Sequence, residues 1–388
     1  MRPLIAMAVL LIAASTAIAE DDPPMKPTGS DLAETRQLLN DLDALFLLQD
    51  ATARGRQDAA ALQKPLLRSI GEGLLRSDLP EPDRIAPYVA AYVLSGGDPA
   101  TAATLAKSEK LQSVSRLLLE GASLYMQGNR EEAAKRLGGI DVTRLPARVG
   151  GRVALAKALL ERNAAAHQSG LSTAVALMPG TLVEESALRR SALAFAESAE
   201  EKSFWRRLER YQRRFPDSLY AMAFWEEIMS VIATWGTKDR TPDLARLDEI
   251  LREMPAERRR SLYLLLARKS SRASNVVMVE FAAPNALRLA AEGSEEQQAA
   301  SLYLSLHAVA SERAADAAAA LKAIRRDLLD AQDQALLDAG LWIDRQITSS
   351  PVVGQSGTAK EQEAKSQLQT RAEELLVEAD RILAESRS

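Results

Sequence analysis

The feature that most constrains this chain is the helical period of its apolar residues, which continues along almost its whole length with short breaks. Most apolar residues are Ala and Leu, which favour helices, and aromatic residues make up only 4% of the chain. The sequence therefore predicts an all-α protein. Its expected helices cover residues 31–54, 58–76, 84–95, 111–127, 146–162, 181–198, 201–214, 218–235, 242–253, 256–271, 285–292, 295–312, 314–329 and 331–347.

Several breaks between these helices carry start signals. Asp98 is an N-cap residue followed by Pro99 at the first helical position, so a helix is expected to open there. Asn129 is expected to cap another helix, which has acidic residues in its first turn. Thr181 and Glu184 have the spacing of a capping box. Short breaks of this kind are typical of paired helices joined by tight turns.

Two junctions resemble each other and indicate a degenerate repeat. Gly97–Ala102 and Gly128–Ala133 share the pattern Gly-[Asp/Asn]-x-x-x-Ala, with starts 31 residues apart. This is close to the 34-residue spacing of tetratricopeptide repeats. We predict a tetratricopeptide-like solenoid of helical hairpins over residues 31–348, with an irregular helical bundle as the alternative. Residues 275–281 have strand-like composition, and we expect a helical or extended connector there.

The N-terminus predicts secretion. Arg2 is followed by an uncharged apolar run, and small residues stand at the −3 and −1 positions before Glu20. We therefore predict a signal peptide over residues 1–19, cleaved between Ala19 and Glu20. A membrane anchor is the alternative, but the run is shorter than the roughly 20 residues of a spanning helix. Residues 20–30 are rich in Pro and charge and are expected to form a disordered leader.

The C-terminus predicts a separate helix. Residues 349–359 have the Ser, Pro and Gly content of a flexible linker, and residues 360–388 continue as one helical stretch. Leu368, Leu375 and Ile382 repeat every seven residues in it, as in a coiled coil. Two arrangements remain open: this helix folds back over the end of the solenoid, or it mediates self-association.

Composition excludes several classes of partner. The formal net charge is −4, and loss of Arg2 with the signal peptide makes it −5, so there is no general basic field for nucleic acid or anionic lipid. After the signal peptide, charged residues interrupt every apolar stretch, so no membrane insertion is expected. The chain has no cysteine, so it has neither a thiol nucleophile nor a disulfide. The predicted location is the periplasm.

No catalytic, cofactor-binding or metal-binding residues are predicted. His167 and His307 are the only histidines and do not form a metal motif; His167 is expected in a loop-like stretch. Glu185-Ser186 resembles the Glu-Ser pair of soluble lytic transglycosylases, but the Gly-Leu-Met-Gln-type loop of those enzymes is missing. The sequence therefore predicts a non-enzymatic binding protein.

Residues 204–215 form the sharpest local feature, because they combine arginine with aromatic residues. We assign Trp205, Arg206, Arg210 and Arg213 as candidate partner-binding residues, since arginine and aromatic side chains favour protein contacts. The alternative divides this helix into two faces. In it, Phe204, Leu208, Tyr211 and Phe215 form an ordinary buried stripe, with the arginines on the solvent side.

Four segments resemble the rhizobial motility protein C (MotC) family: Leu47–Asp50, Tyr92–Pro99, Pro179–Arg190 and Arg213–Ala221. The resemblance covers roughly residues 38–235 and carries no catalytic motif. It implies a periplasmic protein that is needed for flagellar rotation and that stabilises the periplasmic part of the stator subunit MotB. A general periplasmic scaffold for envelope assembly is the alternative function.

Overall fold

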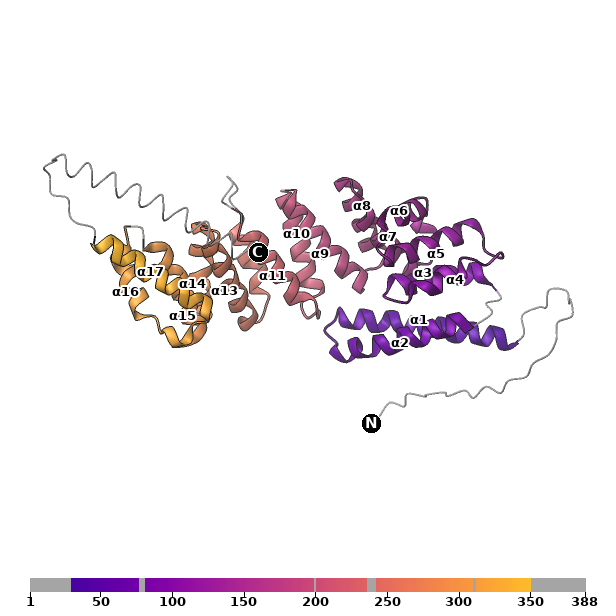
Figure 1. The fold of residues 1–388 in the computed structure, drawn as a ribbon, viewed down its shortest axis with the longest axis horizontal. Helices are drawn as coiled ribbons and strands as arrows, with labels where there is room; N and C mark the ends of the chain where they lie inside the picture. Colours follow the sequence, from indigo (N-terminus) through magenta and orange to yellow (C-terminus); the bar gives the residue numbers. More distant parts are fainter. Residues whose placement is uncertain (1–28, 77–80, 199, 236–241, 310–311, 350–388) are drawn as a thin grey trace, which may run out of the picture. The chain divides into compact units, whose positions relative to one another are not determined.

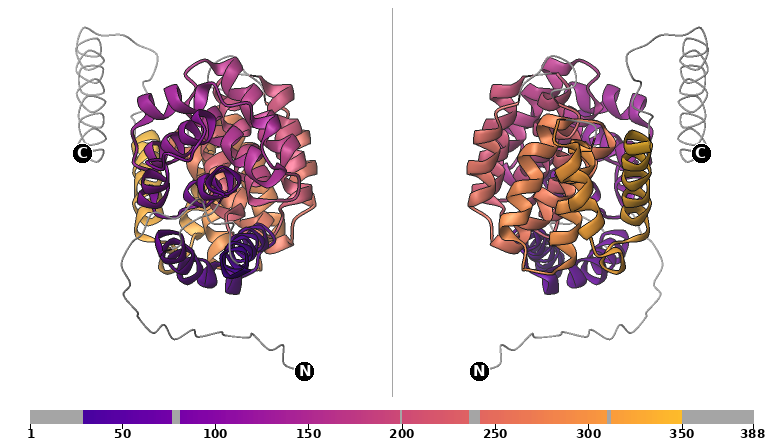
Figure 2. Two further views of the ribbon diagram at one scale, coloured as in Figure 1. Left: turned by 90° about the vertical axis from the view of Figure 1, so that its right-hand side faces the viewer. Right: turned by 90° about the vertical axis from the view of Figure 1, so that its left-hand side faces the viewer.

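The computed structural model describes residues 29–76, 81–198, 200–235, 242–309 and 312–349, and every element in these ranges is a helix (Figure 1). The two turned views in Figure 2 likewise show helices throughout the described part. The prediction of an all-α protein is therefore confirmed. The chain divides into two compact units, of which the first ends at Ala290 and the second begins at Ala291.

The first unit contains fourteen α-helices within the described residues. They are α1 (Gly29–Thr52), α2 (Gln57–Arg76), α3 (Pro82–Leu94), α4 (Pro99–Leu105), α5 (Ser113–Met126), α6 (Arg130–Gly138), α7 (Ala147–Leu160), α8 (Ala164–Leu177), α9 (Leu182–Glu197), α10 (Glu201–Arg214), α11 (Ala221–Ile232), α12 (Leu244–Arg252), α13 (Ala256–Arg272) and α14 (Val276–Leu289). A 3₁₀ turn, η1 (Val142–Arg144), precedes α7.

Helices that follow one another in the chain pack side by side within this unit. The most extensive contacts join α1 with α2, α3 with α5, α5 with α6, α7 with α8, α9 with α10, and α13 with α14. This is the helical-hairpin packing of a solenoid-like all-α fold, as the sequence predicts. Such hairpins bury one face of each helix against neighbours close in sequence.

The core combines many alanines with larger aliphatic residues and a few aromatic ones. Ala90, Ala102, Ala122 and Ala187 are fully buried, which lets neighbouring helices approach closely. The scarce aromatic residues are concentrated inside rather than on the surface. Those almost completely shielded from solvent include Phe46, Tyr92, Phe204, Trp205, Tyr211, Phe215, Phe224, Trp225, Tyr263 and Tyr303.

The predicted helix starts are observed, with one variation. The Asp98 side chain accepts a hydrogen bond from the N–H of Ala100 at 2.9 Å, and that of Asn129 accepts from Glu132 at 3.5 Å. Thr181 Oγ1 accepts from the N–H of Glu184, but the Glu184 carboxylate accepts from the N–H of Gly180 instead of closing the box on Thr181. Each start satisfies backbone donors that a helix leaves unpaired.

Two segments have a more regular structure than the sequence indicates: residues 275–281 take the helical of the two expected forms, and the loop expected around His167 is wrong. Residues 275–281 open α14, because the Asn275 side chain caps its first turn by accepting from the N–H of Met278. The helix expected at 285–292 is the second half of α14 and continues through Pro284. The stretch around His167 lies within α8, capped by Asn163, and the ring Nδ1 of His167 is 2.7 Å from the carbonyl oxygen of Ala158.

The two junctions with the shared sequence pattern have different backbones. In the second, Gly128 has a φ of +80° directly before the cap Asn129. In the first, the positive φ belongs to Gly96, at +98°. The next residue, Gly97, is needed for another reason, because a Cβ there would lie 2.3 Å from the Tyr92 ring. The similarity in sequence therefore reflects helix capping rather than one repeated turn.

The second unit contains α15 (Glu295–Ala308), α16 (Ala314–Ala323), the 3₁₀ turn η2 (Arg326–Leu328) and α17 (Ala331–Ser349) in its described part. Tyr303 on α15 donates to the buried carboxylate of Asp333 on α17 at 2.6 Å. Lys322 on α16 forms an ion pair with Asp344 on α17 at 2.9 Å. These contacts join α15, α16 and α17 to one another.

The expected signal peptide, its cleavage site at Ala19 and Glu20 and the expected helix at 360–388 lie outside the described residues, as does the expected linker at 349–359 apart from Ser349, which ends α17. Within the expected leader of residues 20–30, the described chain is helical from Gly29, two residues before the expected helix start.

Candidate functional site: a basic surface on helix α10

Helix α10 has two clearly different faces. Phe204, Leu208, Tyr211 and Phe215 are buried on one side, which is the stripe that the sequence offered as an alternative. Trp205 is buried as well, with 2% of its surface exposed, and its indole N–H donates to Glu201 at 3.0 Å. Trp205 therefore belongs to the core and not to a partner-binding surface, which corrects that part of the prediction.

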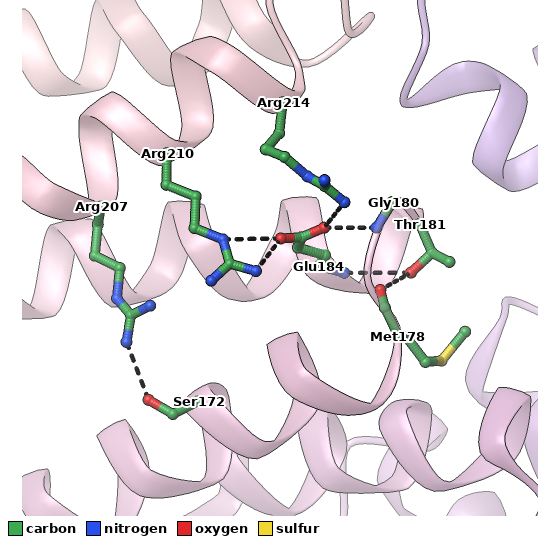
Figure 3. A network of polar contacts seen from close by, with 8 residues as sticks. All are labelled: Ser172, Met178, Gly180, Thr181, Glu184, Arg207, Arg210 and Arg214. Atoms are coloured by element: carbon green, nitrogen blue, oxygen red, sulfur yellow. Dashed lines mark hydrogen bonds and ion pairs between the residues drawn. The ribbon is translucent and has the colours of Figure 1, made fainter.

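A buried carboxylate holds two of the arginines (Figure 3). Glu184, at the start of α9, is completely buried and receives Arg210 from α10 at 2.5 and 2.9 Å through one carboxylate oxygen. Its other oxygen accepts from Arg214 at 2.9 Å and from the N–H of Gly180 at 2.6 Å. Arg210 is thus fixed in place by a structural ion pair, and little of its charge is left for a partner.

The remaining arginines of α10 have no such partner. Arg206 and Arg213 are exposed, and Arg206 donates only to Ser203 Oγ at 3.3 Å. Arg207 is half-buried and donates to Ser172 Oγ on α8 at 3.0 Å. Among the described residues, no carboxylate oxygen lies within 4.0 Å of any of these three guanidinium groups.

These side chains surround a hollow of about 500 Å³ in the surface of the first unit. Its lining consists of Phe195, Ser203, Arg206, Arg207, Glu209, Arg210 and Arg213. Glu209 is the one acidic residue in this lining, and Arg246 on α12 already neutralises it at 2.6 Å. The hollow therefore has an excess of positive charge in a protein whose net charge is negative. It suits an anionic group far better than an apolar one.

Sequence reasoning missed Arg207 as a member of this surface. It assigned Arg206, Arg210 and Arg213 because arginine and aromatic side chains favour protein contacts, but residue type does not reveal which arginine finds a carboxylate. Glu184 lies 26 residues before Arg210, so only the packing of α9 against α10 could identify the pair. The capping-box pattern of Thr181 and Glu184 was the one signal that singled out Glu184.

A second buried carboxylate, Glu185, lies beside the first. Its Oε1 atom accepts from the hydroxyl groups of Tyr211 at 3.0 Å and Ser218 at 2.5 Å, and Oε2 has no hydrogen-bond partner in the described structure. Burial raises the pKa of Glu185 above its ordinary value, against the opposing effects of Ser218, Arg189 and Tyr211. Glu185 thus connects α9 to α10 and to the α10–α11 turn.

The C-terminal end of α1 connects the segments that carry the resemblance. Gln49 donates to the carbonyl oxygen of Ser95 at 2.9 Å, and Asp50 accepts from the N–H of Leu182 at 3.0 Å. The N–H of Leu219 donates to the carbonyl oxygen of Thr52 at 3.3 Å. All four segments therefore meet within the first unit, where they form joints between helices.

Arg152 completes this joint from α7. Its guanidinium group donates to Ser95 Oγ at 2.9 Å and to Gln49 Oε1 at 3.1 Å, and it lies 3.8 Å from the centroid of the Phe46 ring. Burial lowers the pKa of Arg152 to about 10, although the nearby Asp50 opposes this shift. A buried cation with these partners fixes α1, α3 and α7 to one another.

The described residues give no sign of a metal site or a membrane span. No group of three or more His, Asp or Glu side chains there is placed to hold a metal ion. None of the described helices is both long enough and apolar enough to cross a membrane.

The fold and this surface define a class: an all-helical protein whose candidate site is a basic interaction surface supported by buried ion pairs. The sequence matches the family described as chemotaxis protein MotC over residues 2–387, and the chain belongs to that family. It is 28% identical over 319 residues to the chemotaxis protein MotC of Rhizobium meliloti (strain 1021), covering 80% of this chain and 72% of that protein. No solved structure matches this chain. Membership in this family places the protein in chemotaxis and motility.

Proposed function

We propose that this chain is a periplasmic accessory of the flagellar motor that binds and stabilises the periplasmic part of a MotB-type stator subunit. Membership in the MotC family supports the link to motility. The signal peptide expected at residues 1–19 supports export to the periplasm. The proposed action is protein binding without catalysis.

The observation that carries the proposal is the basic surface of α10. Arg206, Arg207 and Arg213 surround a hollow and have no carboxylate partner among the described residues. The helix that presents them is fixed from behind by its buried aromatic stripe and by the contacts of Glu184 and Glu185 with α10. A rigid surface of this kind favours one conformation of a partner by binding it better than the others.

The direct test is calorimetric titration of residues 20–388 with the purified periplasmic region of a cognate MotB-type stator subunit. We expect saturable binding with a defined stoichiometry. Absence of heat at several temperatures, from a protein shown to be folded and helical, would contradict the proposal. A general scaffold for envelope assembly would then be the better hypothesis. Under that hypothesis, loss of the protein should also affect cells that are not motile.

The structure also determines which variants test the surface. Replacing Arg210 would leave the buried carboxylate of Glu184 with fewer partners, so lost binding could reflect lost stability. Arg206→Ala combined with Arg213→Ala removes exposed side chains without breaking an ion pair. We expect weaker stator binding with an unchanged melting temperature. Unchanged affinity in this double variant would contradict the assignment of the surface.

A further inference from the structure

The hollow on α10 has a charge distribution that points to the chemistry of its occupant. Two of its charged residues are already neutralised inside the protein, Arg210 by Glu184 and Glu209 by Arg246. Arg206, Arg207 and Arg213 keep their charge without a carboxylate partner among the described residues. The occupant should therefore supply negative charge, and more than one charge.

Of these three arginines, Arg207 gains the most from an anionic partner. It is half-buried, its one hydrogen-bond partner is the neutral hydroxyl of Ser172, and its guanidinium carbon lies 5.9 Å from the centroid of the Phe195 ring. Burial lowers the pKa of Arg207, and the like charges of Arg210 and Arg206 add to this effect. A guanidinium group in such a place gains more from an incoming carboxylate than a fully hydrated one does.

The spacing along α10 adds a geometric requirement. Arg206 and Arg213 are seven residues apart on one straight helix, which places their Cα atoms roughly 10 Å apart. Carboxylates seven residues apart on a partner helix have the same spacing as Arg206 and Arg213, whereas Arg207 directly follows Arg206 in the same turn of α10 and takes a further carboxylate. A single small anion would bind only some of these three arginines.

We propose that the hollow is a carboxylate-binding site for an acidic helical segment of a partner protein, with the half-buried Arg207 as the main anchor and Arg206 and Arg213 binding further carboxylates. The inference deepens the proposed function, since it takes the α10 surface as the partner-binding face. It names the chemistry of the partner segment: several carboxylates on one helical face, with the outer two about 10 Å apart.

The test uses residues 20–388 and a fluorescent, alanine-based helical peptide with Glu at positions i, i+3 and i+7. A matched peptide has the same composition but Glu at i, i+2 and i+5, which spreads the charges around the helix. Fluorescence anisotropy is followed at low and at physiological salt. We expect the one-face peptide to bind more tightly than the matched peptide, with affinity falling as salt rises. Equal affinity for the two peptides would mean unspecific attraction and would overturn the proposal.

Variants of the chain test the individual arginines. Arg207→Gln is expected to weaken binding of the one-face peptide by roughly tenfold or more, since it removes a charged hydrogen bond. Arg162→Gln is the matched control, because Arg162 is exposed and lies outside the hollow. Should Arg207→Gln lower the melting temperature, Arg206→Gln with Arg213→Gln replaces it. Unchanged affinity in a folded variant would overturn the proposal.

The same samples separate this inference from the proposed function. Peptide binding that depends on Arg207, combined with no binding of the stator region, supports the carboxylate site and contradicts the stator partner. Stator binding that is insensitive to Arg207, combined with no peptide binding, supports the stator partner and overturns the carboxylate site. Displacement of the peptide by inorganic phosphate, at an ionic strength matched with chloride, would overturn the preference for carboxylates.

Discussion

At the scale of single residues, Glu184 is the side chain on which the basic surface depends. It is completely buried, and it compensates the charges of Arg210 and Arg214, whose side chains are 38% and 43% exposed. Breaking a fully buried ion pair costs about 3–5 kcal/mol, and solvent around the two arginines reduces this.

We therefore predict that Glu184→Gln lowers the free energy of unfolding by roughly 1–3 kcal/mol. Urea unfolding followed by circular dichroism measures this change. Glu227→Gln on the exposed side of α11 is the control and should change stability by less than about 0.5 kcal/mol. Equal effects of the two substitutions would show that the Glu184 ion pairs contribute little.

The neighbouring Glu185 makes stability depend on pH. Because burial raises its pKa, the folded chain holds this proton more tightly than the unfolded chain does. The contribution of Glu185 to stability therefore falls as pH rises from the ordinary value of 4.5 through the raised value in the folded protein. Below 4.5 the group is protonated in both states and the penalty disappears.

We predict that Glu185→Gln removes this loss, since a glutamine keeps an acceptor for Tyr211 and Ser218 and does not ionise. The melting temperature of the variant minus that of the unsubstituted chain should increase as the pH rises from about 4 to about 7. Thermal unfolding across this range measures it, with Glu227→Gln as the reference for an exposed carboxylate. A difference that stays constant with pH would contradict the assignment.

At the scale of helices, the α1–α2 junction shows how close the elements approach. Gly55 has a φ of +82°, and a Cβ there would lie 2.4 Å from the carbonyl oxygen of Asp217 in the α10–α11 turn. Gly128 has nearly the same φ, at +80°, but a Cβ there would meet no atom of another residue within 4 Å in the described structure. The two glycines therefore differ in surroundings and not in backbone conformation.

We predict that Gly128→Ala lowers the free energy of unfolding by about 1–2 kcal/mol, because alanine disfavours the left-handed conformation. Gly55→Ala should cost roughly 1–3 kcal/mol more, because backbone atoms of two helix junctions must also move apart. Chemical denaturation of both variants gives the two values. Equal losses would show that α1 does not pack against the α10–α11 turn as described.

Helix α14 shows where the sequence leaves the conformation of a segment undecided and why. Residues 276–279 are Val-Val-Met-Val, whose β-branched side chains favour strands, so the local preference opposes a helix. Asn275 reverses this preference, since it is buried, caps the helix and donates to the carbonyl oxygens of Ala233 and Trp235. Those two carbonyls are about 40 residues away in the chain, and no local pattern reveals them.

The helices around α10 were predictable for the opposite reason. Their period, capping residues and buried stripe all lie within one segment, so local rules suffice. For the candidate site, the sequence predicted most of the arginines but not which of them are paired. Its arginines stand out in the sequence, but their different roles depend on other helices. Arg210 is paired with Glu184, whereas Arg207 has only the hydroxyl of Ser172.

Asn275 provides a prediction at this scale. Asn275→Ala removes a cap worth about 0.5–2 kcal/mol and leaves two buried carbonyl groups without their donor. We expect a loss of roughly 2–4 kcal/mol in the free energy of unfolding, measured by urea denaturation. Asn129→Ala is the matched control, because Asn129 caps an exposed turn and should cost about 1 kcal/mol or less.

At the scale of the whole molecule, the division after Ala290 separates the candidate site from the rest of the chain. Arg206, Arg207 and Arg213, together with the buried carboxylates behind α10, all belong to the first unit. The joint at the end of α1 belongs to it too, so each segment that resembles the family has its partners there.

We therefore predict that residues 29–290 fold alone and bind the one-face acidic peptide with the affinity of the longer chain, within about twofold. The physical reason is that this fragment keeps every described contact that positions the three arginines. Thermal unfolding of the fragment should remain cooperative, as expected for a unit with its own core. A folded fragment with much weaker peptide binding would show that residues from 291 onward contribute directly to recognition, and it would extend the binding surface beyond α10.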